Sequence, residues 1–83
     1  MKVISIDDFQ TLEQLKTYII RTDDLRQLPD ERLKAFYDFC LLNFDHVTVD
    51  VDPESGVRYQ HHYCQHNFKR ICRVAAERYF KVE

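Results

Sequence analysis

The segment HHYCQHNFKR, residues 61–70, concentrates the side chains of this sequence that could do chemistry. Its first six positions hold three histidines and a cysteine, and its last two are basic. Imidazole and thiolate groups are the ligands that zinc prefers, and a cysteine beside a histidine can act as a nucleophile. Clustered cations can instead form a binding face. The segment therefore raises three hypotheses: a metal site, a nucleophilic site and a basic surface.

Helical geometry separates these side chains. If the segment is helical, His62 and His66 share one face, whereas Cys64 lies about 200° around the axis from His62. One helix cannot bring all of them to a single ion. A zinc site would need His62 and His66 together with ligands from elsewhere, and the residues between them do not form an HExxH motif. We therefore predict two exposed histidines and no metal site.

Motifs for catalysis and cofactor binding are otherwise missing from the sequence. Gly56 is the only glycine, which excludes a Walker loop, a dinucleotide fingerprint and a nucleophile elbow. Cys64 and His61 form the nearest nucleophile and base, but no oxyanion-hole motif accompanies them. Residues 50–56, DVDPESG, resemble a calcium loop only faintly, because the glycine is one position late and Pro53 interrupts. We expect a solvated turn here, no enzymatic activity and no cofactor.

Charge is distributed unevenly along the chain. Residues 1–56 hold six Lys/Arg and twelve Asp/Glu, a net charge of −6, whereas residues 57–83 hold six Lys/Arg and two Asp/Glu, a net charge of +4. On a helix over the second segment, five basic or titratable side chains follow one stripe: His62, His66, Lys69, Arg70 and Arg73. We predict that this basic stripe binds a partner.

Two kinds of partner fit a basic stripe. Nucleic-acid-binding domains are commonly basic overall, but this chain has a pI of about 6.0 and no RNP, zinc-finger or helix-turn-helix signature. Another protein is therefore the first expectation and nucleic acid the alternative. The stripe could also simply face acidic neighbours within the chain. An acidic surface could itself be the functional one, made of Asp23, Asp24, Asp30, Glu31 and Asp38.

Two segments have the apolar period of an amphipathic helix. Residues 29–44 begin with Pro29, which suits the first helical position. Their apolar side chains recur at helical spacing: Leu33, Phe36, Tyr37, Cys40, Leu41 and Phe44. Residues 61–80 repeat the pattern with Cys64, Phe68, Ile71, Cys72, Ala75 and Tyr79. We predict two helices with these faces turned toward the core.

Residues 46–60 switch to alternating apolar and polar side chains, which is typical of strands. The DPESG sequence in the middle supplies proline and glycine for a turn, so we predict a β-hairpin. The expected register pairs apolar with apolar and acid with base, and it places Val51 opposite Val57, Val49 opposite Tyr59 and Asp50 opposite Arg58. One face of the hairpin should then be apolar and the other should hold an ion pair.

The N-terminal segment gives a mixed signal. Residues 3–6 are apolar enough for a short strand, and residues 22–27 form a polar connector with room for one helical turn. Between them, residues 7–21 have helical spacing at Phe9, Leu12, Leu15 and Ile19. Ser5 and Thr11 are alternative helix caps, because an acid or amide follows each after three residues. We predict one helix over residues 7–21.

These elements predict one small α+β domain over residues 1–83, ordered helix, helix, β-hairpin, helix, with a short N-terminal strand. Three cysteines without CxxC spacing indicate reduced thiols. No secretory signal or membrane-length apolar run is visible, so we expect a cytoplasmic protein. Phe39 and Leu42 give the helix over 29–44 a second apolar side, which the last helix or a second copy could cover. A small inhibitor, adaptor or regulatory subunit, with a homodimer as one form, is the expectation.

Overall fold

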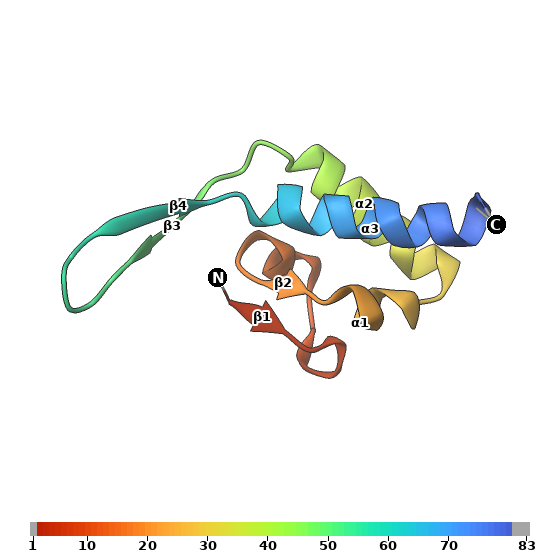
Figure 1. The fold of residues 1–83 in the computed structure, drawn as a ribbon, viewed down its shortest axis with the longest axis horizontal. Helices are drawn as coiled ribbons and strands as arrows, with labels where there is room; N and C mark the ends of the chain where they lie inside the picture. The colour runs from red at the N-terminus through yellow and green to blue at the C-terminus, as the bar shows by residue number, and fades with distance from the viewer. Residues whose placement is uncertain (1, 81–83) are drawn as a thin grey trace.

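The computed structural model describes residues 2–80 and confirms the small α+β fold class (Figure 1). Two long helices, α2 (Asp30–Leu42) and α3 (Tyr63–Tyr79), pack against each other. The hairpin of β3 (Thr48–Val51) and β4 (Arg58–His61) projects away from the helices. The predicted order of these three elements is therefore confirmed.

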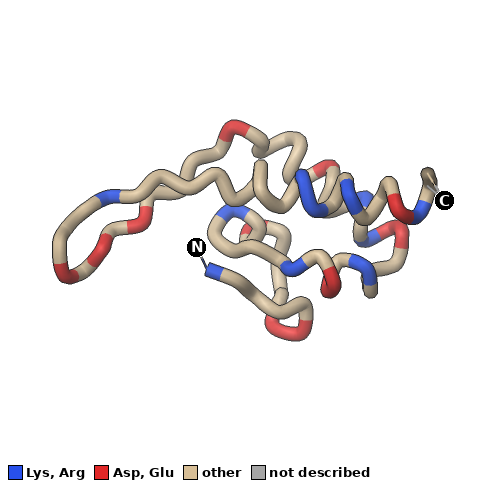
Figure 2. The backbone as a smooth tube through the Cα atoms, in the orientation of Figure 1, with Lys and Arg blue, Asp and Glu red and all other residues tan. Residues whose placement is uncertain are grey.

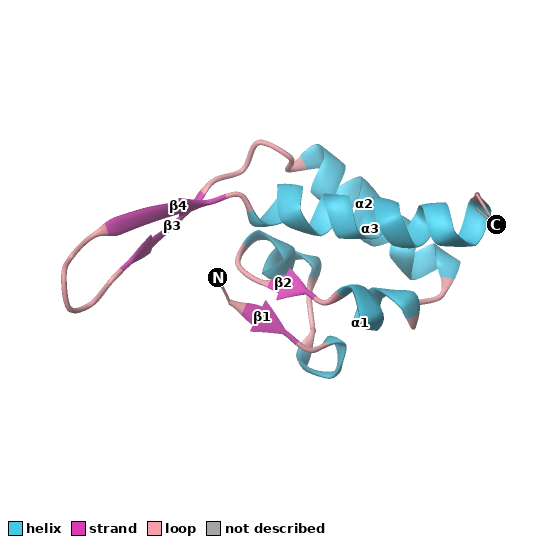
Figure 3. Cartoon of the chain, viewed as in Figure 1, coloured by secondary structure: helices cyan, strands magenta, loops and turns pink. Residues whose placement is uncertain are grey.

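The N-terminal third forms a set of short elements that packs on α3 (Figure 3). Their bounds are β1 (Val3–Ile4), η1 (Ile6–Asp8), η2 (Leu12–Lys16), β2 (Ile19–Ile20) and α1 (Thr22–Arg26), where η denotes a 3₁₀ helix. β1 and β2 pair in parallel, with Ile4 beside Ile20. The predicted N-terminal strand and the helical turn in the connector are both present.

The single helix predicted over residues 7–21 is wrong. Both residues predicted as alternative helix caps are N-caps of separate short helices. Ser5 caps η1, and Thr11 caps η2 through a capping box with Gln14. The Gln14 side chain accepts hydrogen bonds from the backbone of residues 10 and 11, at 2.6 and 3.1 Å. The helical spacing of apolar residues is real, but β2 extends the chain before a longer helix can form.

Asn67 of α3 holds this N-terminal segment in place. Its side chain is buried, and its Oδ1 accepts a hydrogen bond from the Ile20 N–H at 3.1 Å. Its Nδ2 donates to the carbonyl oxygens of Leu15 and Tyr18, at 3.1 and 2.8 Å. One amide therefore supplies hydrogen-bond partners to three backbone groups of the N-terminal segment, and buried polar groups require such partners. This competing set of bonds explains the extended backbone around residues 18–20.

The core lies between α2, α3 and the N-terminal elements. Aromatic pairs link them, since Phe9 lies 4.9 Å from Phe36 and Phe68 lies 5.0 Å from Tyr37, measured between ring centroids. The fully buried side chains include Leu15, Ile20, Leu25, Phe36, Cys40, Tyr63, Cys64, Ile71 and Val74. Phe39 packs against this core, so the chain itself covers part of the second apolar side of α2.

Two predicted core faces need correction. On α2, Leu41 of the predicted core face is half exposed, and Leu42, predicted on the second apolar side, is 85% exposed. On α3, Tyr79 is 59% exposed, and the buried side includes Asn67 and Val74, which lie outside the predicted face. The buried side of α3 is rotated relative to the predicted apolar face because Asn67, a polar residue, fills a core position where its amide finds backbone partners.

The hairpin forms where the sequence predicts it, but the predicted register is wrong by one residue. Val51 pairs with Arg58, Asp50 with Tyr59 and Val49 with Gln60. The turn explains the shift, because Asp52 closes a four-residue loop by donating its N–H to the Val57 carbonyl at 2.9 Å. The Gly56 N–H donates to the Asp52 carbonyl, and Gly56 has a φ of +72° that favours glycine. Neither face of the hairpin is apolar on both strands.

Candidate functional site

The basic stripe predicted on the last helix maps onto the side of α3 that faces away from the core. Lys69 and Arg73 are exposed, and the Arg73 side chain is 73% accessible. Arg70 is half-buried, and its Nη1 donates to the His66 carbonyl oxygen at 3.0 Å. Figure 2 shows the basic positions gathered along this helix. The four helical members of the stripe therefore share one side of α3.

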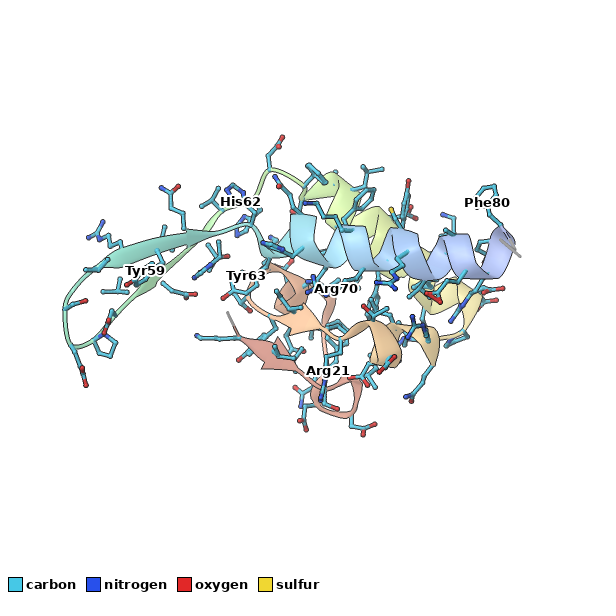
Figure 4. The ribbon with its side chains drawn as sticks, viewed as in Figure 1. Arg21, Tyr59, His62, Tyr63, Arg70 and Phe80 are labelled. Carbon is cyan, nitrogen blue, oxygen red and sulfur yellow. The ribbon has the colours of Figure 1, made fainter. Side chains whose placement is uncertain are left out.

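The prediction that His62 and His66 are exposed is wrong, because both are half-buried. His62 precedes the first turn of α3, at the junction with β4 (Figure 4), and its Nδ1 is buried with no hydrogen-bond partner among residues 2–80. Burial, followed by the positive charges of Arg70 and Lys69, lowers the pKa of His66. His66 is therefore neutral at pH 7. The charge of the stripe comes from Lys69, Arg70 and Arg73, which we call the basic face of α3.

Two other cations near α3, Arg26 and Arg78, are engaged in internal contacts. Arg26 forms a two-pronged hydrogen bond with Glu77, through its Nε at 3.0 Å and its Nη2 at 2.9 Å. Arg78 hydrogen-bonds to Asp30 and also donates to the carbonyl oxygens of Leu25, Arg26 and Leu28 at the end of α1. Internal charge complementarity is thus a real feature of this fold, but it involves these two arginines.

The basic face of α3 has much weaker internal partners. Within the described residues, no carboxylate oxygen lies within 4.0 Å of Lys69 or Arg70, and the Arg73 Nε is 3.9 Å from Glu77, which Arg26 already engages. A contact at that distance between exposed groups contributes about 0–1 kcal/mol. These three cations are consequently available to an external partner.

The acidic surface is more fully neutralised. Asp23 pairs with Arg26, Asp30 with Arg78 and Asp38 with Lys34, each at a distance of 2.9 Å or less. Asp24 accepts a hydrogen bond from the Ile6 N–H at 3.3 Å. Since four of the five acids have such contacts, the acidic surface is a weaker candidate than the basic face of α3.

Arg78 allows a direct test of the internal contacts. Arg78→Ala should lower the free energy of unfolding by about 1–2 kcal/mol, because the last carbonyls of α1 lose their side-chain donor. Chemical denaturation followed by circular dichroism measures this. Arg73→Ala, on the same helix, should change stability by less than about 0.5 kcal/mol. Equal losses in the two variants would show that the hydrogen bonds from Arg78 to the carbonyl oxygens at the end of α1 contribute nothing to stability.

A second polar cluster lies at the base of the hairpin and is absent from the sequence-based prediction. The Tyr63 hydroxyl donates to Asp50 Oδ2 at 2.9 Å, and His61 Nε2 lies 3.3 Å from the same oxygen. The Thr48 hydroxyl donates to the Lys16 carbonyl oxygen. The predicted register assigns Asp50 to Arg58, and the observed register frees it for these contacts. They attach the base of the hairpin to the helices.

The alternative chemistries considered for residues 61–70 have little geometric support. Within residues 2–80, no three His, Cys, Asp or Glu side chains come close enough to hold a metal ion. Cys64 is buried beside Cys40, and its thiol lies 3.6 Å from the Leu15 carbonyl oxygen. Burial raises the pKa of Cys64, which keeps its thiol protonated and makes it a poor nucleophile. The acidic segment 50–56 forms a turn in which Asp52 accepts the Glu54 N–H.

An apolar pocket of about 350 Å³ lies between the start of α2 and the end of α3. Its lining comprises Asp30, Glu31, Leu33, Lys34, Tyr37, Ile71, Ala75 and Tyr79. Its polar rim belongs to the acidic surface, and the pocket is separate from the basic face of α3.

Comparison with known proteins gives no relative from which a function could be transferred. No protein-family model, no curated protein and no solved structure matches this chain significantly. None of the helices in the described part of the chain has both the length and the apolar character needed to cross a membrane.

Proposed function

We propose that this protein is a binding module that acts on another protein through the basic face of α3. The observation that carries the proposal is the charge pairing of the fold. Arg26 and Arg78 are engaged internally, whereas Lys69 and Arg70 have no carboxylate partner in the described chain and Arg73 has a long one. Cations on one side of a helix, two of them exposed and one half-buried, can recognise a complementary acidic surface.

The proposed role is that of a cytoplasmic inhibitor, adaptor or regulatory subunit, which works by binding rather than by catalysis. Adjacent positive charges accelerate encounter with an acidic surface and help to fix its orientation. The half-buried Arg70 is braced by its hydrogen bond to the His66 carbonyl, so less side-chain freedom is lost when it binds. A protein partner is favoured over nucleic acid because three adjacent cations in an acidic chain give few phosphate contacts.

Capture of partners from native lysate on tagged protein, followed by an affinity measurement on the recovered partner, tests this proposal. The triple variant Lys69→Glu/Arg70→Glu/Arg73→Glu should keep its helical circular dichroism and bind at least about tenfold more weakly, because charge reversal converts attraction into repulsion. The matched control Lys2→Glu/Arg32→Glu/Arg58→Glu changes the net charge equally at other exposed positions and should bind like the wild type.

The outcomes separate three hypotheses. Wild-type affinity in the first triple variant would refute a role for the basic face of α3. Equal weakening in both triple variants would assign the effect to net charge alone. Recovery of nucleic acid, with protein partners lost on nuclease treatment and affinity that falls steeply with salt, would support the nucleic-acid alternative instead.

A further inference from the structure

The hairpin of β3 and β4 carries an unusual share of the exposed apolar surface. The molecule is 47 Å long but only 24 and 23 Å in its other dimensions, and Figure 1 shows that the hairpin accounts for one end of this length. Its exposed apolar side chains, each between 37% and 55% accessible, are Val47, Val49, Val51, Val57 and Tyr59. A two-stranded hairpin alone is marginally stable in water, whereas additional strands stabilise it.

The outer edge of β3 has free backbone groups. Asp52 donates its N–H toward β4, to the Val57 carbonyl. Backbone groups alternate in direction along an antiparallel strand, so Asp50 also faces β4, while Val49 and Val51 direct their N–H and C=O groups to the opposite edge. Among residues 2–80, no strand pairs with that edge. It can therefore accept another strand.

The sequence around β3 is complementary to itself when read in the opposite direction. The segment HVTVDVD, residues 46–52, is centred on Val49. In an antiparallel pair of two such segments, Val49 faces its own copy. The other opposed pairs are Val47 with Val51, Thr48 with Asp50 and His46 with Asp52. Apolar side chains meet apolar ones, the hydroxyl meets a carboxylate, and the two acids of each segment avoid those of the other.

We propose that β3 pairs with β3 of a second copy of this chain, in antiparallel orientation about a two-fold axis at Val49. The two hairpins then form one four-stranded sheet. The residues that would exchange backbone hydrogen bonds are Val47, Val49 and Val51, which are those directed to the free edge. Pairing lengthens β3 by one residue at its start. The valines lie on the face opposite Asp50, which is attached to Tyr63, so the two copies build a continuous valine surface away from the helices.

The outer edge of β4 fits a second copy less well. Antiparallel self-pairing centred on Tyr59 would place Val57 opposite His61, an apolar side chain against a polar one, and would leave Arg58 opposite Gln60. β4 also runs directly into α3 through His62. The observations therefore select the β3 edge.

Cysteine cross-linking tests both the partner and the register. In a Cys72→Ser background, Val49→Cys should form a disulfide-linked dimer under mild oxidation, because directly opposed strand residues have Cα atoms about 5.5 Å apart. Val47→Cys alone should not cross-link with itself, but a mixture of Val47→Cys and Val51→Cys chains should. Val57→Cys is the matched control, since Val57 and Val49 are similarly exposed. Equal cross-linking of Val57→Cys and Val49→Cys would contradict the pairing.

Light scattering supplies a second measurement without added cysteines. The wild-type chain should be dimeric at about 100 µM. Val49→Lys should raise the dimer dissociation constant at least about tenfold, because two lysines then face each other at the axis, while Val57→Lys should not. A monomeric wild type, or a dimer indifferent to Val49→Lys, would overturn the proposal. Neither outcome depends on the basic face of α3, so the two proposals can fail separately.

Discussion

Replacing Asn67 with leucine should lower the free energy of unfolding by about 3–5 kcal/mol. Leucine has a similar size, but it offers no hydrogen bond to the Ile20 N–H or to the carbonyl oxygens of Leu15 and Tyr18. Each buried backbone group left without a partner costs about 1–3 kcal/mol. The added apolar surface of leucine offsets only part of this loss. Urea denaturation followed by circular dichroism would measure the difference.

Gln65→Leu provides a matched control for this prediction. Gln65 is an amide on the same helix, two residues away and only partly buried. Its replacement should change stability by less than about 0.5 kcal/mol. If Asn67→Leu cost no more than Gln65→Leu, the amide of Asn67 would not be the group that holds the N-terminal segment.

Stability should also fall at alkaline pH because of Cys40. The thiol is fully buried, and burial, followed by the nearby Cys64, raises its pKa from 9.0 to about 12. The folded-state pKa is thus above the unfolded-state value, so this stabilisation is fully present below pH 9 and is lost as pH rises toward 12. The loss is about 1.4 kcal/mol per pH unit in that window, or on the order of 4 kcal/mol in total.

Comparison with Cys40→Ala isolates this contribution from other groups that titrate in the same range. Between about pH 8 and 10.5 the wild type should lose roughly 2 kcal/mol more than the variant, as measured by urea denaturation at each pH. Parallel pH profiles for the two proteins would mean that the buried Cys40 thiol ionises equally in both states.

The parts of the fold that the sequence predicts well are those governed by local rules. α2 and α3 each extend over more than three turns with a steady apolar period, and Pro29 marks the start of α2. The hairpin is predicted because alternation and the DPESG turn agree. These signals lie within the segments themselves, so no distant partner is needed to interpret them.

The parts that the sequence does not predict depend on distant partners. Residues 7–21 have helical spacing, but their backbone bonds to Asn67, which lies about fifty positions later. A polar residue in a helical pattern is ordinarily assigned to the exposed side, and so the predicted buried stripe of α3 is wrong at Asn67. The predicted hairpin register is wrong for a different, local reason, because the loop is closed by the hydrogen bonds of Asp52 with Gly56 and Val57.

The candidate sites follow the same division. The basic face of α3 is visible in the sequence, because the spacing of Lys69, Arg70 and Arg73 determines which side they share. Which cations remain available is not visible there, since it depends on Arg26 and Arg78 meeting acids from distant elements. The self-complementary segment at 46–52 is a sequence signal that becomes informative only once the free edge of β3 is known.

The hydrogen bonds of the Asn67 side chain also constrain the order in which the chain can fold. The backbone groups of Leu15, Tyr18 and Ile20 form hydrogen bonds with a side chain that is translated 47 to 52 residues later. On the ribosome, the N-terminal third would emerge without these partners and stay unstructured until the start of α3 is exposed. Such long loops close slowly compared with local helix contacts. The N-terminal elements of this domain should therefore be among its last parts to acquire their native structure.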